Sequence, residues 1–385
     1  MARPAQQKKL SGHGRKRSVR RKRVDYYDYS LLAVIILLTC FGLIMLYSTS
    51  SYMAEVKYGD DMYFFKKQAL ISAVCIVAAV VISKIDYHIL GRFTTILYVS
   101  ALFLMALVKF TPLGQEVNGA RRWLKVGIQF QPAEIAKIAV IVCLPYMIIE
   151  MGRQIKTLKS CMILAAAGGV LAFGAYFLTD NLSTAIIILG IGVILIFVSS
   201  PGYVQFVGMG SAGVAFITVF LAAESYRLER LAIWRNPEKY EKGFQTIQGL
   251  YAIGSGGLFG RGLGSSLQKL GFVPEAQNDM IFSIICEELG LVGAGILIII
   301  FALLLWRLCV TAMHSRDLQG TLISAGIMGH MAIQVILNIS VVTNTIPNTG
   351  ITLPFISYGG TSVVFLLAEM GLALSVSSHR KEKTA

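Results

Sequence analysis

The chain has 385 residues, of which 55% are hydrophobic and only 15% are charged. Soluble domains typically carry about 25% charged residues, so this composition excludes an ordinary soluble enzyme. Much of the formal net charge of +14 arises near the N-terminus, because ten of the 35 lysines and arginines lie in residues 1–23.

The basic segment 15–23 directly precedes the first long apolar run. Lysines and arginines beside a membrane span keep that end in the cytoplasm and are attracted to anionic lipid. A nucleic-acid-binding tail is the alternative, and the adjoining span argues against it. The apolar run is too long for a secretion signal, and no small-residue cleavage site follows it. We therefore expect residues 1–28 to form a disordered cytoplasmic tail, with no nucleic-acid partner.

Long apolar runs recur along the whole chain, and each can cross a bilayer core about 30 Å thick. The sequence therefore predicts an all-α integral membrane protein with about ten transmembrane helices. They form one membrane domain over residues 29–380, and a short cytoplasmic tail follows at 381–385. The expected spans are 30–50, 67–84, 93–111, 131–150, 160–178, 183–199, 203–223, 280–306, 320–343 and 361–378.

An even number of spans places both termini on the same side of the membrane. Both terminal flanks are basic, at 15–23 and at 380–381, so that side is expected to be the cytoplasm. The other loops support this orientation only weakly. It makes residues 224–279 a large outer loop between the seventh and eighth helices.

A first group of candidate site residues surrounds the outer loop 111–131. Arg122 and Trp123 lie in the loop, and Glu134 and Lys137 follow at the start of the next span. Glu134 and Lys137 are three residues apart and share a helix face. Either they form a self-neutralising ion pair, or the cations contact an anionic substrate group, since ionisable residues in spans are costly and usually functional.

A second candidate group is the polar hinge 179–184, which contains Asn181 between two spans. Such a composition usually caps the following helix, and substrate binding is the alternative interpretation.

The outer loop 224–279 begins with an amphipathic pattern and continues with a helical pattern at 245–251. It then has six glycines within residues 254–264, around Arg261. Glycines allow the backbone to pass close to a ligand. A dinucleotide site is excluded, because no βαβ unit surrounds these glycines.

Asp279 is the last ionisable residue before the eighth span, four residues after Glu275. Asp279 could cap the helix, where the helix dipole would lower the pKa of its carboxyl. It could instead be a general base in a partly desolvated pocket, which would raise that pKa. The spacing alone does not decide between the two.

The segment 344–362 interrupts membrane-depth sequence with two prolines, three glycines and several hydroxyls, including that of Ser357. Irregular backbone at this depth persists only where protein or a polar cavity covers it, so we expect a re-entrant or cavity-lining segment.

Together these pieces resemble the SEDS family (shape, elongation, division and sporulation), the FtsW/RodA/SpoVE group, over nearly the whole chain. The last motif and the PEAQND sequence are closer to the FtsW/SpoVE branch than to RodA. The motifs, in family order, are NGARRWL, QPAEIAK, YRLERL, GFQTIQGLYAIGSGGLFGRGLGSSLQK, VPEAQNDMIFSIICEELG and IPNTGITLPFISYGGTS.

The resemblance implies a ten-helix peptidoglycan glycosyltransferase of the bacterial cytoplasmic membrane, which polymerises lipid II at the outer face for cell division or related septal wall synthesis. It implies a class B penicillin-binding protein as partner, with other divisome or elongasome membrane proteins. The catalytic aspartate of the family corresponds to Asp279. Two departures are Thr179-Asp180, where the family usually has Glu-Pro or Gln-Pro, and Gln277-Asn278, where it often has His-Thr or Gln-Thr.

On this basis we expect Asp279 to act as general base, with lipid II and its polyprenyl chain bound by several side chains. No acidic cluster in the sequence demands a metal or cofactor, although a divalent cation (Mg²⁺ or Mn²⁺) would assist with the pyrophosphate. The alternatives are a lipid II flippase and a non-catalytic scaffold for a penicillin-binding protein. The expected substrate-binding residues are Arg122, Trp123, Glu134, Lys137, Arg261, Asn181 and Ser357.

Overall fold

The computed structural model describes residues 27–117, 119–199, 210 and 231–379. Within them, nine helices are long and apolar enough to cross a membrane, which confirms the predicted all-α membrane fold. Most of the basic tail, the expected span 203–223 and the start of the outer loop lie outside these ranges. The nine helices are α1 (Tyr29–Tyr58), α2 (Tyr63–Ile82), α3 (Thr94–Phe110), α4 (Pro132–Met151), α5 (Leu158–Thr179), α6 (Leu182–Ser199), α10 (Ile281–Met313), α11 (Leu318–Val342) and α12 (Gly360–Ser378).

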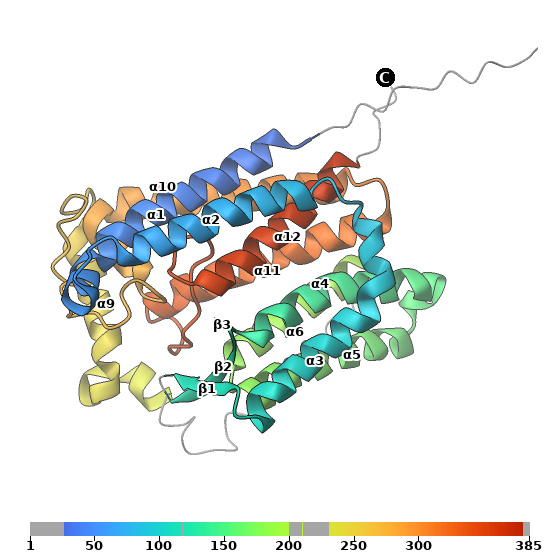
Figure 1. Cartoon of the computed structure of the whole chain (residues 1–385), viewed down its shortest axis with the longest axis horizontal. Coiled ribbons are helices and arrows are strands. Elements are labelled where there is room, and N and C mark those ends of the chain that lie inside the picture. The colour runs from blue at the N-terminus through green and yellow to red at the C-terminus, as the bar shows by residue number, and fades with distance from the viewer. Residues whose placement is uncertain (1–26, 118, 200–209, 211–230, 380–385) are drawn as a thin grey trace, which may run out of the picture.

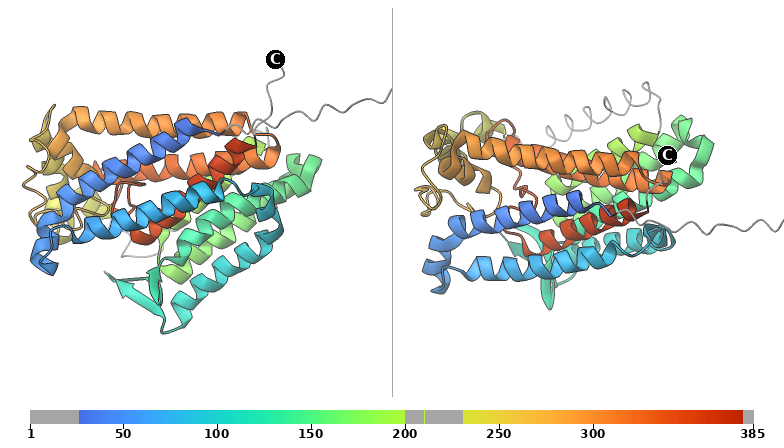
Figure 2. Two further views of the ribbon diagram at one scale, coloured as in Figure 1. Left: turned by 45° about the horizontal axis from the view of Figure 1, so that its top comes forward. Right: turned by 90° about the horizontal axis from the view of Figure 1, so that it is seen from above.

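The helices form two neighbouring groups, with α3 to α6 in one and α1, α2 and α10 to α12 in the other (Figure 1). The start of α1 and the end of α12 lie at the same end of the bundle. The shorter helix α9 (Phe244–Gly256) and three β-strands gather at the opposite end, as Figure 2 also shows. The chemistry-bearing loops described below therefore share one end of the molecule.

The centre of the bundle is built from α4, α11 and α12, in which 56%, 61% and 67% of the most apolar stretch is buried. In α2 and α3 only 22% of the corresponding stretch is buried. Apolar side chains that face lipid need no protein cover, so α2 and α3 lie at the periphery of the bundle. The polar residues of α4, α11 and α12 are surrounded by protein.

The loop after α3 folds as an antiparallel sheet, which the sequence analysis did not predict. Its strands are β1 (Gly114–Val117), β2 (Ala120–Val126) and β3 (Ile128–Phe130), in the order β1-β2-β3. Gly119 and Gly127, next to strand ends, both have positive φ angles of 73°, as glycines in hairpin turns often do. The strands are three to seven residues long, so alternation along them is a weak signal against the surrounding helices.

Helix α10 is interrupted at Gly290, where φ is 68° and ψ is −169°. The glycine-rich loop supplies the missing hydrogen bonds. Its Arg261 and Gly262 N–H groups donate to the carbonyls of Glu287 and Glu288, both at 2.9 Å. A Cβ on Gly260 would lie 2.1 Å from the Glu288 carbonyl oxygen, so only glycine fits there. In the described structure, the close approach that the glycines permit is therefore to α10.

Residues 343–359 have no helix or strand, and Ile351, Leu353 and Phe355 are buried among the helices. The Phe355 carbonyl oxygen lies 2.2 Å from the place where a Cβ on Gly42 of α1 would stand. The segment thus inserts into the bundle beside α1, and its irregular backbone is covered by protein, as expected.

Candidate active site

Asp279 lies two residues before the start of α10, but it does not cap the helix. The helix begins at Ile281, its N-cap is Met280, and no side chain makes a capping hydrogen bond. The capping interpretation of Asp279 is therefore wrong. The carboxyl group remains available for another role, and its side chain is partly accessible to solvent.

Burial among protein atoms and, to a lesser extent, the nearby charge of Glu275 raise the pKa of Asp279 to about 7. Hydrogen bonds from the backbone N–H groups of Asp279 and Met280 lower the pKa only in part. A general base works best when its pKa lies near the operating pH. This carboxyl group therefore has the proton affinity that base catalysis at neutral pH needs.

One amide contacts the Asp279 carboxylate, and a second amide holds the first in place. Gln245 Nε2, on α9, lies 3.5 Å from Asp279 Oδ1 and 3.4 Å from the Pro274 carbonyl oxygen. Asn348 Nδ2 donates to Gln245 Oε1 at 3.3 Å, while its Oδ1 accepts from the Gly350 N–H at 3.1 Å. The Gly350 N–H can only donate and the Pro274 carbonyl can only accept, so the orientation of both side-chain amides is determined. Among the described residues, Glu275 is the charged group whose field shifts the pKa of this carboxyl.

The inserted segment is attached to this site on two sides. The Tyr358 N–H donates to the Gln277 carbonyl at 2.8 Å, two residues before Asp279. Ser183 Oγ of α6 donates to the Thr349 carbonyl at 2.6 Å. Ser357 is buried, and its hydroxyl accepts a hydrogen bond from the Leu353 N–H at 2.8 Å. The Ser357 side chain thus helps to fold the segment itself.

Glu134 and Lys137 form the ion pair that their spacing predicts, with Lys137 Nζ 2.9 Å from Glu134 Oε2. Both side chains are buried in the first turns of α4, and only 2% of Lys137 is exposed. Transferring an ammonium group from water to such a site is costly unless it is paired, which the carboxylate of Glu134 achieves.

Arg122 and Trp123 lie on β2, and Arg122 reaches the hinge between α5 and α6. Its Nε donates to the Asp180 carbonyl at 3.2 Å. Asn181 Oδ1 accepts from the Thr184 N–H at 3.1 Å, so the default capping interpretation of Asn181 is confirmed. The hinge in turn contacts the inserted segment through Ser183, which connects β2 to the neighbourhood of Asp279.

Arg261 is directed to another part of α10. Its Nη1 lies 3.6 Å from Glu287 Oε1, and Glu287 is eight residues beyond Asp279, a distance of about 12 Å along a helix. The adjacent Glu288 pairs with Lys269 Nζ at 2.8 Å and accepts a hydrogen bond from Ser48 Oγ of α1 at 2.6 Å. These contacts hold the glycine-rich loop against α1 and α10.

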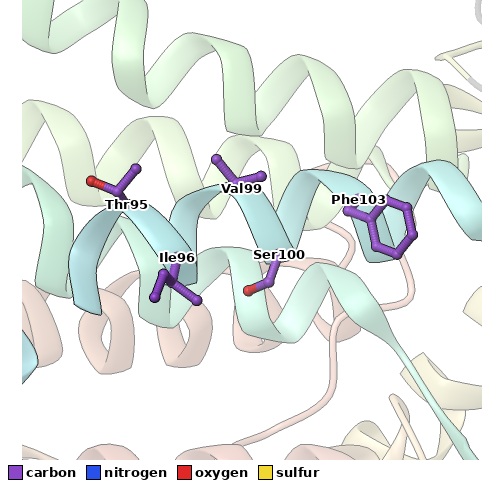
Figure 3. Close-up of a pocket in the computed structure, with 5 residues that line it drawn as sticks. All are labelled: Thr95, Ile96, Val99, Ser100 and Phe103. Atoms are coloured by element: carbon purple, nitrogen blue, oxygen red, sulfur yellow. The ribbon is translucent and has the colours of Figure 1, made fainter.

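No group of three or more histidines, cysteines, aspartates or glutamates that could hold a metal ion occurs in the described part of the chain. A hollow on α3 is lined by five side chains, three of them apolar (Figure 3). It lies in the α3 to α6 group and contains no ionisable residue, so it is not part of the site around Asp279. Its lining residues are Thr95, Ile96, Val99, Ser100 and Phe103.

Three amides beside Asp279 were not singled out from the sequence, namely Gln245, Asn338 and Asn348. Gln245 and Asn348 belong to motifs that carry the family resemblance, but nothing in their spacing points to Asp279. Asn338 offered a better signal, because an amide in a transmembrane helix needs polar partners.

Comparison with known proteins places this arrangement in a family. The model of the FtsW/RodA/SpoVE family, described as "cell cycle protein", matches residues 28–382. The chain is 37% identical to the stage V sporulation protein E of Bacillus subtilis (strain 168), over 92% of this chain and 98% of that protein. It is 35% identical to the probable peptidoglycan glycosyltransferase FtsW of Trichlorobacter lovleyi, over 93% of this chain and 95% of that one.

Two solved structures share the fold at 27% sequence identity. One is described as structural coordination of polymerization and crosslinking by a peptidoglycan synthase complex, with a TM-score of 0.77 over 91% of this chain and 97% of that one. The other is the rod shape determining protein RodA of Thermus thermophilus, with a TM-score of 0.68 over 93% and 98%. With its membrane helices and the match over nearly its full length, this chain belongs to the FtsW/RodA/SpoVE family of multi-pass membrane proteins.

Proposed function

We propose that the chain is a peptidoglycan glycosyltransferase that transfers disaccharide units of lipid II onto a growing glycan chain at the outer face of the bacterial cytoplasmic membrane. Relatives at 35% and 33% identity are described as probable peptidoglycan glycosyltransferases. The observation that carries the proposal is the carboxyl group of Asp279, partly accessible, with a pKa of about 7, at the outer-loop end of the bundle.

In the proposed reaction, a hydroxyl of the acceptor sugar attacks the anomeric carbon of the lipid-linked donor. A glycosidic C–O bond forms, and the bond from the anomeric carbon to the pyrophosphate oxygen breaks, so undecaprenyl pyrophosphate leaves. Asp279 takes the proton of the attacking hydroxyl, a contribution typically worth about 10²–10⁴-fold in rate. Gln245, whose Nε2 lies 3.5 Å from the carboxylate, holds the Oδ1 atom toward α9.

The departing pyrophosphate needs cationic partners, because charge-assisted hydrogen bonds stabilise it most strongly. We assign this role to Arg122 and Lys137. A substrate contact of Arg261, which the structure directs to Glu287, stays a prediction. Lys137 is paired with Glu134, so binding a phosphate there exchanges one anionic partner for another. Substrate contacts of Trp123, Asn181 and Ser357 stay predictions, as does assistance by Mg²⁺ or Mn²⁺, to which we assign no step.

The same proposal covers topology and partners. Both termini are cytoplasmic, which the basic N-terminal segment and the shared end of α1 and α12 support. A class B penicillin-binding protein is the proposed partner, since a structural relative belongs to a complex that combines polymerization and crosslinking. Other divisome or elongasome membrane proteins complete the assembly.

Polymerisation of purified lipid II tests the proposal. Wild-type protein, alone and co-purified with a class B penicillin-binding protein, is expected to form glycan ladders on a gel. Asp279→Ala should reduce the rate at least about 10²-fold, because no neighbouring group replaces the base. Glu238→Ala, an exposed carboxylate elsewhere in the outer loop, is the matched control and should keep the wild-type rate. Full activity of a folded Asp279→Ala protein would remove this residue from the mechanism.

A further inference from the structure

Asn338 is a buried amide of transmembrane helix α11 that the chemistry above does not use. Its Nδ2 donates two hydrogen bonds, to the Asp279 carbonyl at 2.8 Å and to the Ile351 carbonyl at 2.7 Å. Carbonyl oxygens only accept, so the amide nitrogen must face both of them, and the orientation of the side chain is determined. The first of these hydrogen bonds ties the Asp279 backbone to a side chain of another element.

The two carbonyls belong to two backbone segments that lie beside the reactive carboxyl group. The Asp279 carbonyl carbon is bonded directly to the Cα that carries that carboxyl side chain. Ile351 follows Gly350 in the inserted segment, and a Cβ on Gly350 would stand 3.9 Å from Asp279 Oδ2. Asn338 therefore joins the backbone of the carboxyl group to the backbone of the wall that the carboxyl faces.

A second contact restrains the same stretch of chain. The Tyr358 N–H, also on the inserted segment, donates to the Gln277 carbonyl at 2.8 Å. With Gln277 held at one end, Asp279 at the other and the helical turn of α10 starting at Ile281, the direction of the Asp279 Cα–Cβ bond has little freedom. Of these restraints, only the one at Asp279 comes from a side chain, so it can be removed by substitution.

We infer that Asn338 is a positioning residue, which holds the Asp279 carboxylate against the inserted segment so that it meets the acceptor hydroxyl in a productive geometry. This inference rests on the proposed role of Asp279 as base. A displacement of about 1 Å at a reacting group costs about 10²-fold in rate, which is the size of effect that loss of the two hydrogen bonds should produce.

The chain provides a matched control one helical turn away. Gln334 lies four residues before Asn338 on α11, is 2% exposed, and donates from Nε2 to the Thr352 carbonyl at 3.0 Å. Gln334→Ala thus removes a buried amide and a hydrogen bond to the same inserted segment, but none of its described contacts is to Asp279. Any general loosening of the segment should affect both variants alike.

The experiment compares Asn338→Ala, Asn338→Ser, Gln334→Ala and Asp279→Ala in lipid II polymerisation with purified full-length protein. We expect Asn338→Ala to lower kcat about 10²-fold with KM within about twofold, and Gln334→Ala to stay within about threefold. Asn338→Ser keeps one donor and should fall between. The acidic limb of the pH profile should also move to lower pH in Asn338→Ala, because a released carboxyl group becomes better hydrated. Glu275 is the titratable neighbour on the same stretch. From other described elements, Gln245 contacts the Asp279 carboxylate and Asn338 contacts its carbonyl, and neither amide titrates.

The outcomes separate the two claims. If Asp279→Ala keeps polymerising, the proposed base is wrong, whatever Asn338 does. If Asp279→Ala is inactive but Asn338→Ala matches Gln334→Ala in kcat and in pH profile, the positioning role is overturned. Melting temperatures in detergent report folding. If Asn338→Ala melts well below Gln334→Ala, then Asn338→Ser decides, because a wild-type pH profile and rate in that variant contradict the inference.

Discussion

At the scale of single residues, the central feature is a carboxyl group kept in a setting that disfavours its charge. Burial and the charge of Glu275 raise the pKa of Asp279 to about 7, well above the ordinary value of 3.8. A raised folded-state pKa means that folding is favoured while the group is protonated, and this advantage is complete only below about pH 4. It is lost as the pH rises through about 7, so ionised Asp279 destabilises the folded protein.

This linkage predicts that Asp279→Asn stabilises the protein in a pH-dependent way. The variant keeps the shape of the side chain but never ionises, so its advantage over wild type should be small at pH 5. At pH 8 it should reach a melting temperature higher by roughly 5 °C. The measurement is thermal unfolding in detergent at both pH values. An equal difference at pH 5 and pH 8 would show that the carboxyl group is not strained by its charge.

Predictions from sequence at this scale worked where local spacing determines the contact. The Glu134–Lys137 pair follows from positions three apart on a helix, and the Asn181 cap follows from composition at a helix start. Asp279 could not be decided, because its pKa depends on burial by α9, α11 and the inserted segment, which are distant in sequence. Asn338 was missed for the same reason, since its two acceptors lie 59 and 13 residues away.

At the scale of elements, the bundle contains ionisable pairs whose members are too far apart in the sequence for their contact to be predicted. His330 of α11 and Glu369 of α12 are both buried, and His330 Nδ1 lies 2.7 Å from Glu369 Oε2. The two helices lie side by side (Figure 1). A pair of this kind costs desolvation energy, but breaking it costs more, because the remaining group stays buried without its partner.

A double-mutant cycle should reveal this coupling. His330→Leu and Glu369→Leu are each expected to destabilise the protein by about 3–5 kcal/mol, whereas the double variant should recover most of the loss. Thermal unfolding of the four proteins in detergent provides the comparison. Strictly additive losses would show that the two side chains do not depend on each other.

The element boundaries also show what patterning can and cannot predict. Nine of the ten expected spans correspond to described helices, because a run of apolar residues is sufficient to identify a span. The interruption of α10 at Gly290 could not be predicted from the hydropathy of the sequence, because the flanking residues are apolar on both sides. It depends on Gly260, whose backbone fits against Glu288 only without a side chain, and this contact joins loop and helix across 28 residues.

At the scale of the whole molecule, the site elements gather at one end of the bundle. The start of α10, helix α9 and the three-stranded sheet lie opposite the end at which α1 begins and α12 ends (Figure 1). A lipid-linked substrate keeps its polyprenyl chain in the bilayer while its sugars project into water. A base at the edge of the helices suits that geometry, because it reaches the sugars and not the chain.

Labelling of single cysteines should test which end faces outward. In a background lacking the six native cysteines, Glu238→Cys in the outer loop should react in intact cells with a maleimide that cannot cross membranes. Arg316→Cys, between α10 and α11, should react only after the cells are opened. Both side chains are exposed, so accessibility is matched. The reverse pattern would contradict the proposed orientation.

The most direct test of the central claim is the pH dependence of kcat/KM for lipid II polymerisation by the purified protein. If Asp279 is the base, the rate should fall on the acidic side with a midpoint near pH 7. Glu275→Gln removes a like charge and should move that midpoint to lower pH, whereas Glu238→Gln should leave it unchanged. A rate that is constant from pH 5 to pH 8 would contradict the assignment of Asp279 as general base. So would a midpoint that is the same in Glu275→Gln as in the wild type.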